Sequence, residues 1–532
     1  VRNVYYGELY LAWHRGTYTT QAGIKKGVRR AEYALREAEY LAGLLRLSEK
    51  AVLERNLDAE AVEKLAELWK KLLFQEFHDI LPGTSIHRVN REALEALEQV
   101  EQESRELAEK LLERLAGGRA VFNSLSWERS WKGKVLPACG YMKLQDNNEG
   151  VEVSCRPDGT EAVSWRENFD GKGGLRIQNS FYLVEMDREG RIFSLKDRST
   201  GYEYAEGPLN HFRLYRDVNV DYDAWELGRM YEEMEEALAG EAVMEVRREG
   251  RNLIVALHKQ EPHFAVDQQI LFLADTPRIG FQTQVDWRDR HRILKVDFPT
   301  TVYTKEALEE IQFGYLKRPT HRSRQYEQDL YETCHHKYAA LTDGKNGFAL
   351  LNDCKYGISA RDSRLSLTLL RAPVLPDMEA DQGVHVFSYG ILPFLGPFVY
   401  SRVPREAYEW NVEPVETTAQ TNPFNMEETP SMERFSFFEV EGDHVILETC
   451  KPAFDIENGV VLRLYESMGC AGRAHLTVLA CVKRAYACNM LEERQKELEI
   501  REGRIALDFG AFQIQTLLLE TRERNFRADG TG

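Results

Sequence analysis

The chain has 532 residues, of which 43% are hydrophobic and 29% are charged. This composition excludes a mainly disordered chain, and at roughly 150 residues per domain the length predicts about three or four domains. Lys and Arg total 69 against 86 Asp and Glu, a formal charge of −17, which argues against nucleic acid or an anionic membrane surface as a partner because both attract positive charge. The sequence contains no apolar run of about 18 residues, so we expect no membrane-spanning helix.

The first 117 residues have the pattern of a helical bundle. After Gly23, apolar residues recur at steps of three and four: Ile24, Val28, Ala31, Leu35, Ala38, Ala42 and Leu45. Asp58 is placed to cap a second helix, which Pro82-Gly83 ends. Thr84 or Ser85 is placed to cap a third, which Gly117-Gly118 ends. We therefore predict a three-helix bundle with a leading segment over residues 1–117.

Beyond residue 118 the pattern changes to short runs rich in Val, Ile, Phe, Tyr and Thr, separated by turn residues. Such runs are typical of antiparallel β-sandwiches rather than of βαβ units. We predict an α+β, mostly β fold with a large antiparallel β-sandwich (supersandwich) region. Its parts are a β-sandwich domain at 118–402, a connecting segment with four prolines at 403–433, and a C-terminal β-sandwich portion at 434–532.

One stretch within the large β-region interrupts the strand pattern. Residues 219–236 mix aromatic and acidic side chains, which predicts a long loop or a short helix. The acidic run Glu232 to Glu236 is most simply a solvated face.

The eight cysteines form no CxxC pair and have no histidines at zinc-finger spacing. Sparse cysteines without such spacing predict free thiols in a reducing compartment, so we expect a cytoplasmic protein. The N-terminal segment also lacks the basic and apolar regions of a signal peptide. Because the first residue is Val1 rather than Met, we expect the sequence to begin inside a longer protein.

The stretch FQEFHDILPGTS is the most unusual short motif. It places His78 and Asp79 on the last turn of the second predicted helix, just before the Pro-Gly break. In that position His78 is a candidate metal ligand and Asp79 a candidate acceptor for substrate hydroxyls. The alternative is a histidine whose positive form is satisfied by the helix C-terminus, and no second ligand lies at helical spacing from His78.

Two further clusters carry alternatives that the residues leave open. The polar and aromatic segment Trp13 to Gln21 suits either the lining of a cleft or an ordinary loop with Thr19 or Thr20 capping the first helix. The adjacent His335 and His336 suggest a metal site, but neighbouring residues of a strand point to opposite faces, so we expect one inward and one outward imidazole.

The motifs GELYLAWHRGTYTTQ and FHDILPGTSI, together with VFNSLSWER, DYDAWELG, HHKYAALTDGKNGFALLNDCKYG, LPDMEADQGVHVFSYGILP and VVLRLYES, resemble glycoside hydrolase family 38, the α-mannosidases. The resemblance spans essentially the whole chain in the right order. It is closest to the bacterial and cytosolic branch of the family.

The resemblance implies an N-terminal catalytic domain, a three-helix bundle and large β-sandwich domains, of which this chain lacks the first. It implies a zinc ion in the intact enzyme, with His78 as one ligand and the other ligands and the nucleophile in the missing domain. Asp79 matches a residue that contacts the bound sugar, and Arg463 resembles an arginine that approaches the active site. The implied chemistry is retaining hydrolysis of α-mannosides, so we expect this chain to be inactive alone, with no catalytic residue of its own.

The alternative function is a non-catalytic carbohydrate-binding or assembly module, in which Tyr222 and Trp225 stack on sugars. These aromatic side chains equally suit an interface with the missing domain. Because family members often assemble through these domains, we expect a homo-oligomer.

Overall fold

The fold is a computed structural model that describes residues 8, 10, 13–48, 55–144, 161–166, 174–219, 221–417, 434–456, 458–480 and 482–521. Three long helices form an antiparallel bundle, α1 (Ala22–Leu47), α2 (Arg55–Gln75) and α3 (His87–Ala116). Two short helices, α4 (Gln325–Gln328) and α5 (Val403–Asn411), lie in the β-region, and single 3₁₀ turns span Arg15–Tyr18, Arg229–Glu233 and Phe398–Tyr400. None of the described helices is long and apolar enough to cross a membrane.

The large β-sandwich consists mainly of a nine-stranded and a six-stranded antiparallel sheet. In sheet order the nine strands are β11 (Ala242–Glu249), β12 (Asn252–Gln260), β13 (Phe264–Phe272), β14 (Ile279–Trp287), β23 (Gly383–Leu395), β20 (Asn346–Asn352), β19 (Tyr338–Thr342), β16 (Glu306–Ile311) and β17 (Gly314–Pro319). The six strands are β10 (Glu235–Glu236), β9 (His211–Arg216), β15 (Arg292–Pro299), β22 (Arg364–Arg371), β21 (Gly357–Arg361) and β18 (Thr333–Cys334). A four-stranded sheet adds β5 (Glu161–Arg166), β6 (Gly174–Gln178), β7 (Tyr182–Asp187) and β8 (Ile192–Asp197).

The C-terminal sandwich packs a five-stranded sheet against a three-stranded one. The five strands are β27 (Val445–Pro452), β28 (Gly459–Glu466), β33 (Ile514–Thr521), β30 (Val482–Cys488) and β31 (Arg494–Leu498), and the three are β26 (Phe438–Glu441), β29 (Gly472–Val478) and β32 (Arg504–Phe509). Beside it lie the sheet β24 (Val415–Glu416), β1 (Ala120–Asn123), β4 (Gly140–Lys143), β25 (Arg434–Ser436) and the hairpin β2 (Arg129–Trp131), β3 (Lys134–Leu136). The predicted antiparallel, mostly β fold with an N-terminal helical bundle is confirmed.

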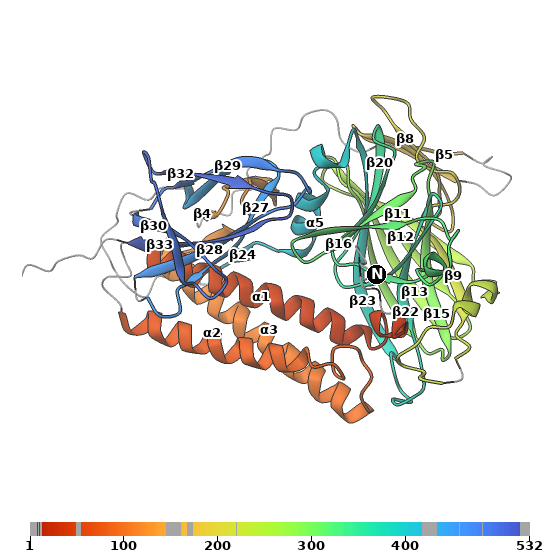
Figure 1. Ribbon diagram of the computed structural model, residues 1–532. Helices are drawn as coiled ribbons and strands as arrows, with labels where there is room; N and C mark the ends of the chain where they lie inside the picture. The colour runs from red at the N-terminus through yellow and green to blue at the C-terminus, as the bar shows by residue number, and fades with distance from the viewer. Residues whose placement is uncertain are drawn as a thin grey trace, which may run out of the picture.

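The bundle and the C-terminal sandwich share one hydrophobic core. The predicted apolar stripe of the first helix is buried in it, as are apolar side chains of β27, β28 and β33. The contact is close enough to require glycine at position 43, because a Cβ there would lie 2.9 Å from Cys450 Sγ and 3.0 Å from the Lys451 backbone nitrogen. Figure 1 shows the C-terminal strands lying along α1, with the large sandwich at the other end of the bundle.

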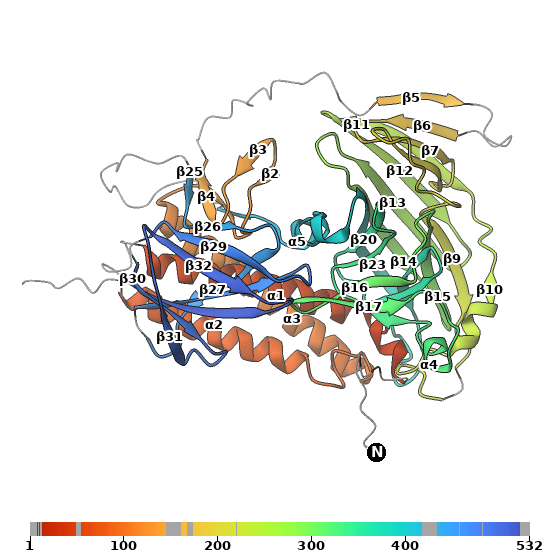
Figure 2. The same cartoon turned by 45° about the horizontal axis from the view of Figure 1, so that its top comes forward.

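The segment at 403–433 was predicted to be an irregular connection, but its first part is helical. Residues 403–411 form α5, where Pro404 falls in the first turn that tolerates proline. Tyr408 of α5 packs with Trp127 and Tyr465, and Figure 2 shows the helix between the two β-bodies. Residues 418–433 lie outside the described part of the chain. The predicted domain boundaries at 118, 403 and 434 stay predictions, although β1 and β4 pair with β24 and β25 rather than with the large sandwich.

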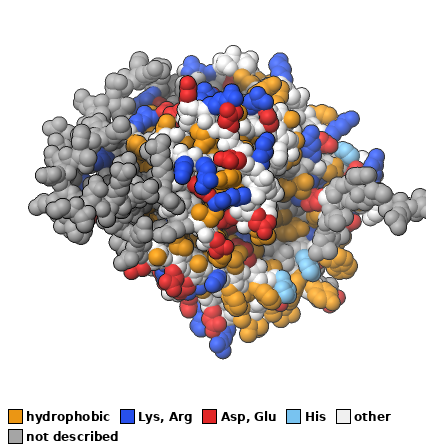
Figure 3. All heavy atoms as spheres, turned by 60° about the vertical axis from the view of Figure 1, so that its left-hand side comes forward, with side chains coloured by type: hydrophobic (Ala, Val, Ile, Leu, Met, Phe, Trp, Pro, Cys, Tyr) orange, Lys and Arg blue, Asp and Glu red, His pale blue; other side chains and the backbone are white. Residues whose placement is uncertain are grey.

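The predicted helix caps are wrong, and the prediction about the acidic run 232–236 holds only in part. The acidic run is a solvated face only in part: Glu233 and Glu235 are exposed, but Glu235 and Glu236 of β10 pair with Arg213 and Arg292, and Glu232 pairs with Arg322. Helix α2 already begins at Arg55, so Asp58 lies inside it, and the N-cap of α3 is Ile86 rather than Thr84 or Ser85. The first helix is not capped by a threonine either. Its N-cap is Gln21, and the Asp381 carboxylate accepts hydrogen bonds from the backbone nitrogens of Gln21 and Ala22 at 2.7 Å each. On the face drawn in Figure 3, acidic and basic side chains lie interspersed.

Candidate functional site

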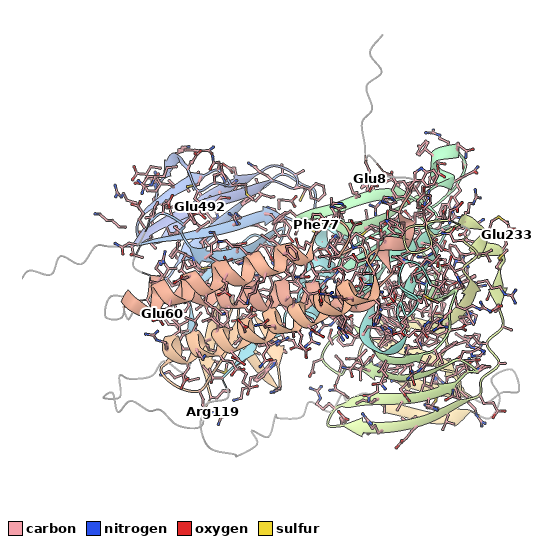
Figure 4. All side chains as sticks on the ribbon, turned by 90° about the horizontal axis from the view of Figure 1, so that it is seen from below. Glu8, Glu60, Phe77, Arg119, Glu233 and Glu492 are labelled. Carbon is pink, nitrogen blue, oxygen red and sulfur yellow. The ribbon has the colours of Figure 1, made fainter. Side chains whose placement is uncertain are left out.

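His78 and Asp79 lie in a turn after α2 rather than on its last turn. The helix ends at Gln75, where the hydrogen bonds from the Glu76 and Phe77 nitrogens to the Leu73 and Phe74 oxygens tighten to the i→i−3 pattern. The chain then turns sharply ahead of Pro82, which cannot continue a helix. The His78 side chain is 78% exposed, and its Nε2 lies 3.7 Å from an oxygen of Asp79, which is 52% exposed. Figure 4 places the neighbouring Phe77 where the bundle meets the β-domains.

Lys25 of α1 holds the loop that carries His78 in place through hydrogen bonds to the backbone. The Lys25 ammonium donates to the backbone oxygen of Leu81 at 2.8 Å and to that of Thr20 at 2.5 Å. Burial lowers the pKa of Lys25 to about 7. The hydroxyl of Ser85 closes the loop by donating to the Asp79 backbone oxygen at 2.8 Å. The exposed His78–Asp79 pair is thus presented on a rigid base.

Gly83 is the tightest point of this loop. Its φ is +79°, and a Cβ there would lie 2.6 Å from the Thr20 oxygen and 2.7 Å from Gln21 Cβ. We expect Gly83→Ala to lower the free energy of unfolding, measured by urea titration, by about 2–4 kcal/mol through left-handed strain and overpacking. Gly344→Ala is the matched control, because Gly344 has a φ of +88° and open space around it. Equal losses in the two variants would contradict the close contact.

A hollow of about 660 Å³ lies where the bundle, the large sandwich and the C-terminal sandwich meet. From the bundle it is lined by residues of α1, by Trp69 of α2 and by residues that flank His78 and Asp79. Those of α1 are Lys25, Arg29, Glu32, Tyr33, Arg36 and Glu39, and the flanking ones are Glu76, Leu81 and Pro82. The β-domains contribute Gln312, Phe313, His336, Lys337, Tyr356, Tyr408, Glu448, Thr449 and Arg463, and the leading segment contributes Thr17 and Tyr18. The hollow therefore brings Arg463 and the flanks of the FHDILPG motif to one place.

The tip of the β16–β17 hairpin closes one side of the hollow. Phe313 packs edge-on against Tyr465 of β28 with ring centroids 5.4 Å apart, and Tyr315 packs against Phe512 at 5.0 Å. The Tyr315 hydroxyl donates to the Met468 backbone oxygen at 3.0 Å. The large sandwich and the C-terminal sandwich thus hold the rim in a fixed position.

Charges of both signs face the hollow. Arg36 pairs with Glu448 at 3.0 Å, and Glu39 accepts a hydrogen bond from the Trp69 indole at 3.2 Å. The Glu32 carboxylate has no hydrogen-bond or ion-pair partner among the described residues, and burial, reinforced by nearby Glu76, raises its pKa. Arg463 Nη2 donates to the Met490 backbone oxygen at 3.4 Å.

The structure separates the predicted site residues into two groups. Arg463 lines the hollow, whereas His78 and Asp79 lie on the exposed loop at its edge. Within the described residues no three His, Cys, Asp or Glu side chains gather as a metal site. His335 is fully buried, whereas His336 is half-buried and lines the hollow. Both lie in the bend between β18 and β19 rather than in a strand, so strand alternation is not what separates them. Of the sugar-stacking candidates, Tyr222 is 68% exposed and Trp225 is half-buried.

The sequence analysis did not predict that residues of α1 line a cavity, although the sequence contains a pattern that indicates it. Beside the apolar stripe of α1 runs a second stripe at the same spacing, which consists of Lys25, Arg29, Glu32, Arg36 and Glu39. Three of them, Lys25, Arg29 and Arg36, are less than 10% exposed, so a charged stripe on a long helix inside a multidomain chain is a signal for a polar cavity.

The helical bundle and the two β-sandwiches, with a polar and aromatic hollow at their junction, define a multidomain protein of bundle and β-sandwich type. Three models of one such family match this chain in order: the alpha mannosidase middle domain over residues 12–115, the glycosyl hydrolases family 38 C-terminal domain over 177–379, and the family 38 C-terminal beta sandwich domain over 444–517. The chain belongs to glycosyl hydrolase family 38, of which it contains the middle and C-terminal domains.

Curated relatives agree with this assignment. The chain is 32% identical to alpha-mannosidase 2C1 of Mus musculus and 33% identical to that of Homo sapiens, in each case over 96% of this chain and 50% of the relative. An alpha-mannosidase of Saccharomyces cerevisiae is 27% identical over 91% of this chain and 45% of its own length. The chain therefore spans about half the length of the curated relatives it matches.

The fold also matches a solved structure. The crystal structure of an alpha-mannosidase from Enterococcus faecalis superposes with a TM-score of 0.74 over 96% of this chain and 69% of that one, at 14% sequence identity. The arrangement of bundle and sandwiches is thus the family's fold.

Proposed function

We propose that this chain is the middle and C-terminal part of a zinc-dependent retaining α-mannosidase that hydrolyses terminal α-mannosides. The observation that carries the proposal is the match of both domain types, in order, to relatives that are named alpha-mannosidases. We further propose that the other zinc ligands and the nucleophile belong to a segment outside these 532 residues, so that the chain alone is inactive.

Within the described part of the chain, the donor set fits one position of a zinc site. The His78 imidazole is exposed and available, but zinc sites in enzymes use about three protein ligands, and the described residues offer no such cluster. Zinc would supply Lewis-acid charge that holds sugar hydroxyls. His78 then serves as a ligand and not as a proton donor or acceptor.

The chain's own residues have two roles in this proposal. The Asp79 carboxylate is half-exposed beside His78 and can accept hydrogen bonds from sugar hydroxyls. Arg463 faces the hollow and can donate to a hydroxyl. In a retaining mechanism two carboxyl groups act at the scissile bond, one as nucleophile and one as acid and then base, and we assign neither to this chain.

The test is an activity assay of a longer polypeptide. In it, this chain is joined to a segment that corresponds to the half of the relatives that this chain does not match. We expect turnover of an aryl α-mannoside that a chelator abolishes and zinc restores, and no turnover by the 532-residue chain. His78→Ala should weaken zinc affinity at least about tenfold. His263→Ala, at an exposed histidine in the turn between β12 and β13, should leave it unchanged. Turnover by the isolated chain, or an unaltered zinc affinity in His78→Ala, would refute the assignment.

We also propose a cytoplasmic location, supported by the six described cysteines, all of which are free thiols, Cys155 and Cys481 being outside the described residues. Assembly into a homo-oligomer is a proposal that rests on the family resemblance alone. Light scattering, which measures the molar mass of the protein in solution, tests this oligomeric state.

A further inference from the structure

One edge of the large sandwich has no partner strand in the described part of the chain. β11 is the end strand of the nine-stranded sheet, and Figure 2 shows the row of β13, β12 and β11. Its eight residues pair with β12 in register without a bulge, and none of them is a proline. An open edge is a template for another chain, and proteins protect such edges with prolines, bulges or short strands. β11 has none of these three features.

The other end strands of the described sheets differ from β11. β10 and β18 span two residues each, and β17 ends at Pro319. β27 also has eight residues, but its register shifts between Leu447 and Thr449, and the strand lies along α1. The remaining end strands have six residues or fewer. β11 is therefore the longest regular edge among the described strands.

The hydrogen bonds of the neighbouring strands show which backbone groups of β11 face outward. The Glu261 nitrogen donates to the Phe264 oxygen at 2.8 Å where β12 turns into β13. Backbone groups alternate in direction along an antiparallel strand, so the odd-numbered residues of β12 face β13 and the even-numbered ones face β11. Through the observed register, the N–H and C=O groups of Met244, Val246 and Arg248 then point away from β12. These three residues form the unpaired side of the edge.

The side chains of β11 carry charges of both signs. Glu245 and Arg247 are exposed and, being two residues apart, lie on one face of the strand. The Glu245 carboxylate has no hydrogen-bond or ion-pair partner among the described residues. Arg247 Nε lies 3.3 Å from Glu249 Oε1, and its Nη2 donates to Gln269 Oε1 at 3.1 Å. An acidic and a basic side chain therefore stand on either side of Val246 at the open edge.

We propose that β11 pairs antiparallel with β11 of a second copy of this chain, about a twofold axis at Val246, which joins two nine-stranded sheets into one. In this register the two Val246 residues exchange backbone hydrogen bonds, and Glu245 of each copy lies opposite Arg247 of the other. Opposite charges directly across an antiparallel pair stabilise it, and like charges destabilise it. Moving the axis by one residue would set Glu245 opposite Glu245, or Arg247 opposite Arg247, so the charges select the register.

The same charge pattern explains why the partner is a second copy and why assembly stops at two. A strand that pairs here needs a base opposite Glu245 and an acid opposite Arg247, and the chain's own β11 supplies both. Each copy has one β11 edge, which the pairing uses completely, so the interface is closed. This pairing gives the proposed homo-oligomer a defined interface and does not depend on the proposed α-mannosidase function.

Sedimentation equilibrium of the 532-residue chain, from micromolar to submillimolar concentration, tests the pairing. We expect a mass that approaches twice that of one chain. Glu245→Arg and Arg247→Glu each set like charges opposite one another at both pairs, so either variant alone should weaken the dimer about tenfold or more. In an equimolar mixture of the two variants, a copy with two basic positions meets a copy with two acidic positions. Mixed dimers should therefore form about as tightly as those of the parent chain.

Glu497→Arg is the matched control, because Glu497 is an exposed glutamate on β31, the end strand of a different sheet. It should leave the dimer unchanged, and all three variants should melt at the temperature of the parent chain. A monomer at every concentration, dimers that neither β11 variant weakens, or variants that stay monomeric when mixed would each overturn the proposal. A larger assembly that is insensitive to both β11 variants would refute this edge and leave the homo-oligomer in place.

Discussion

Replacing Arg371 by methionine is expected to lower the free energy of unfolding by about 3–5 kcal/mol, the usual result of leaving one member of a buried ion pair alone. Arg371 Nε lies 2.7 Å from Asp217 Oδ2, and each side chain is 1% exposed. The remaining guanidinium nitrogens donate to the Thr20 hydroxyl and to three backbone oxygens of the DYDAWELG segment, those of Asp223, Ala224 and Glu226. Methionine fills part of the volume but leaves the Asp217 carboxylate without its cation and the Asp223 oxygen without the donor it has in Arg371. The Ala224 and Glu226 oxygens keep Thr20 and Asn219 as donors.

The exposed pair Arg473–Asp508 is the matched control for this prediction. Its Nε–Oδ1 distance is 2.6 Å, almost the same, but its side chains are 62% and 73% exposed. Arg473→Met should leave the free energy of unfolding close to that of the parent chain, because water screens an exposed ion pair. Urea titration of both variants at one pH measures the contrast. Similar losses would show that the Arg371 network contributes no more than a surface pair.

The effect of Arg371→Met should reach the site as well as the stability. Arg371 joins Thr20, which lies next to the start of α1, to the 223–226 loop, and Thr20 is also the residue whose backbone oxygen receives Lys25. Loss of the arginine therefore loosens the base of the His78 loop. On the proposed function, in which His78 is a zinc ligand, the same variant should weaken zinc binding by the longer polypeptide.

The sequence allowed prediction of those parts of the fold whose pattern is local. The first helix and the end of the third follow from apolar spacing and from Gly117, which adopts the left-handed C-cap conformation. The antiparallel strands follow from short β-branched runs between turns. What could not be predicted depends on partners distant in sequence. Asp381, 360 residues from Gln21, replaces the expected threonine cap, and α5 is too short for its period to stand out.

The candidate site divides in the same way. The motif that carries His78 was visible because it is a compact stretch of unusual residues, although the helix was expected to extend through it. The hollow was not visible, because its lining comes from α1, the β16–β17 hairpin, β27 and β28. Only the fold brings these segments together. The pattern of residues along the sequence does not predict which charged side chains come into contact.

Acidification should destabilise this protein through His335, with a total effect of about 5 kcal/mol over the full titration. The side chain is fully buried, and burial, together with the charges of Arg29 and Arg318, lowers its pKa to about 3. In the unfolded chain a histidine titrates near its ordinary value of about 6.5. Between these two values the unfolded chain binds a proton that the folded chain does not, so stability falls as the pH falls from about 6.5 towards about 3.

The hydrogen bonds of His335 explain why the folded state keeps the neutral ring. Nδ1 lies 3.1 Å from the Tyr356 backbone oxygen and donates to it, and Nε2 lies 3.0 Å from Asn352 Nδ2 and accepts from it. The Asn352 amide cannot turn round, because its nitrogen also donates to the His336 oxygen at 2.7 Å and its oxygen accepts from the Lys355 nitrogen at 2.7 Å. A second proton on His335 would therefore face a fixed donor.

His335→Gln isolates this contribution, because the glutamine amide can donate to Tyr356 and accept from Asn352 yet carries no proton at any pH. Between about pH 7 and pH 4.5 the parent chain should lose about 2.5 kcal/mol more of unfolding free energy than the variant. Urea titrations at the two pH values measure this difference. Burial also lowers the pKa of His211 and His385, but both histidines are common to the two proteins and cancel. Parallel pH profiles of parent and variant would show that His335 accepts its proton in the folded state, against the geometry of its two partners.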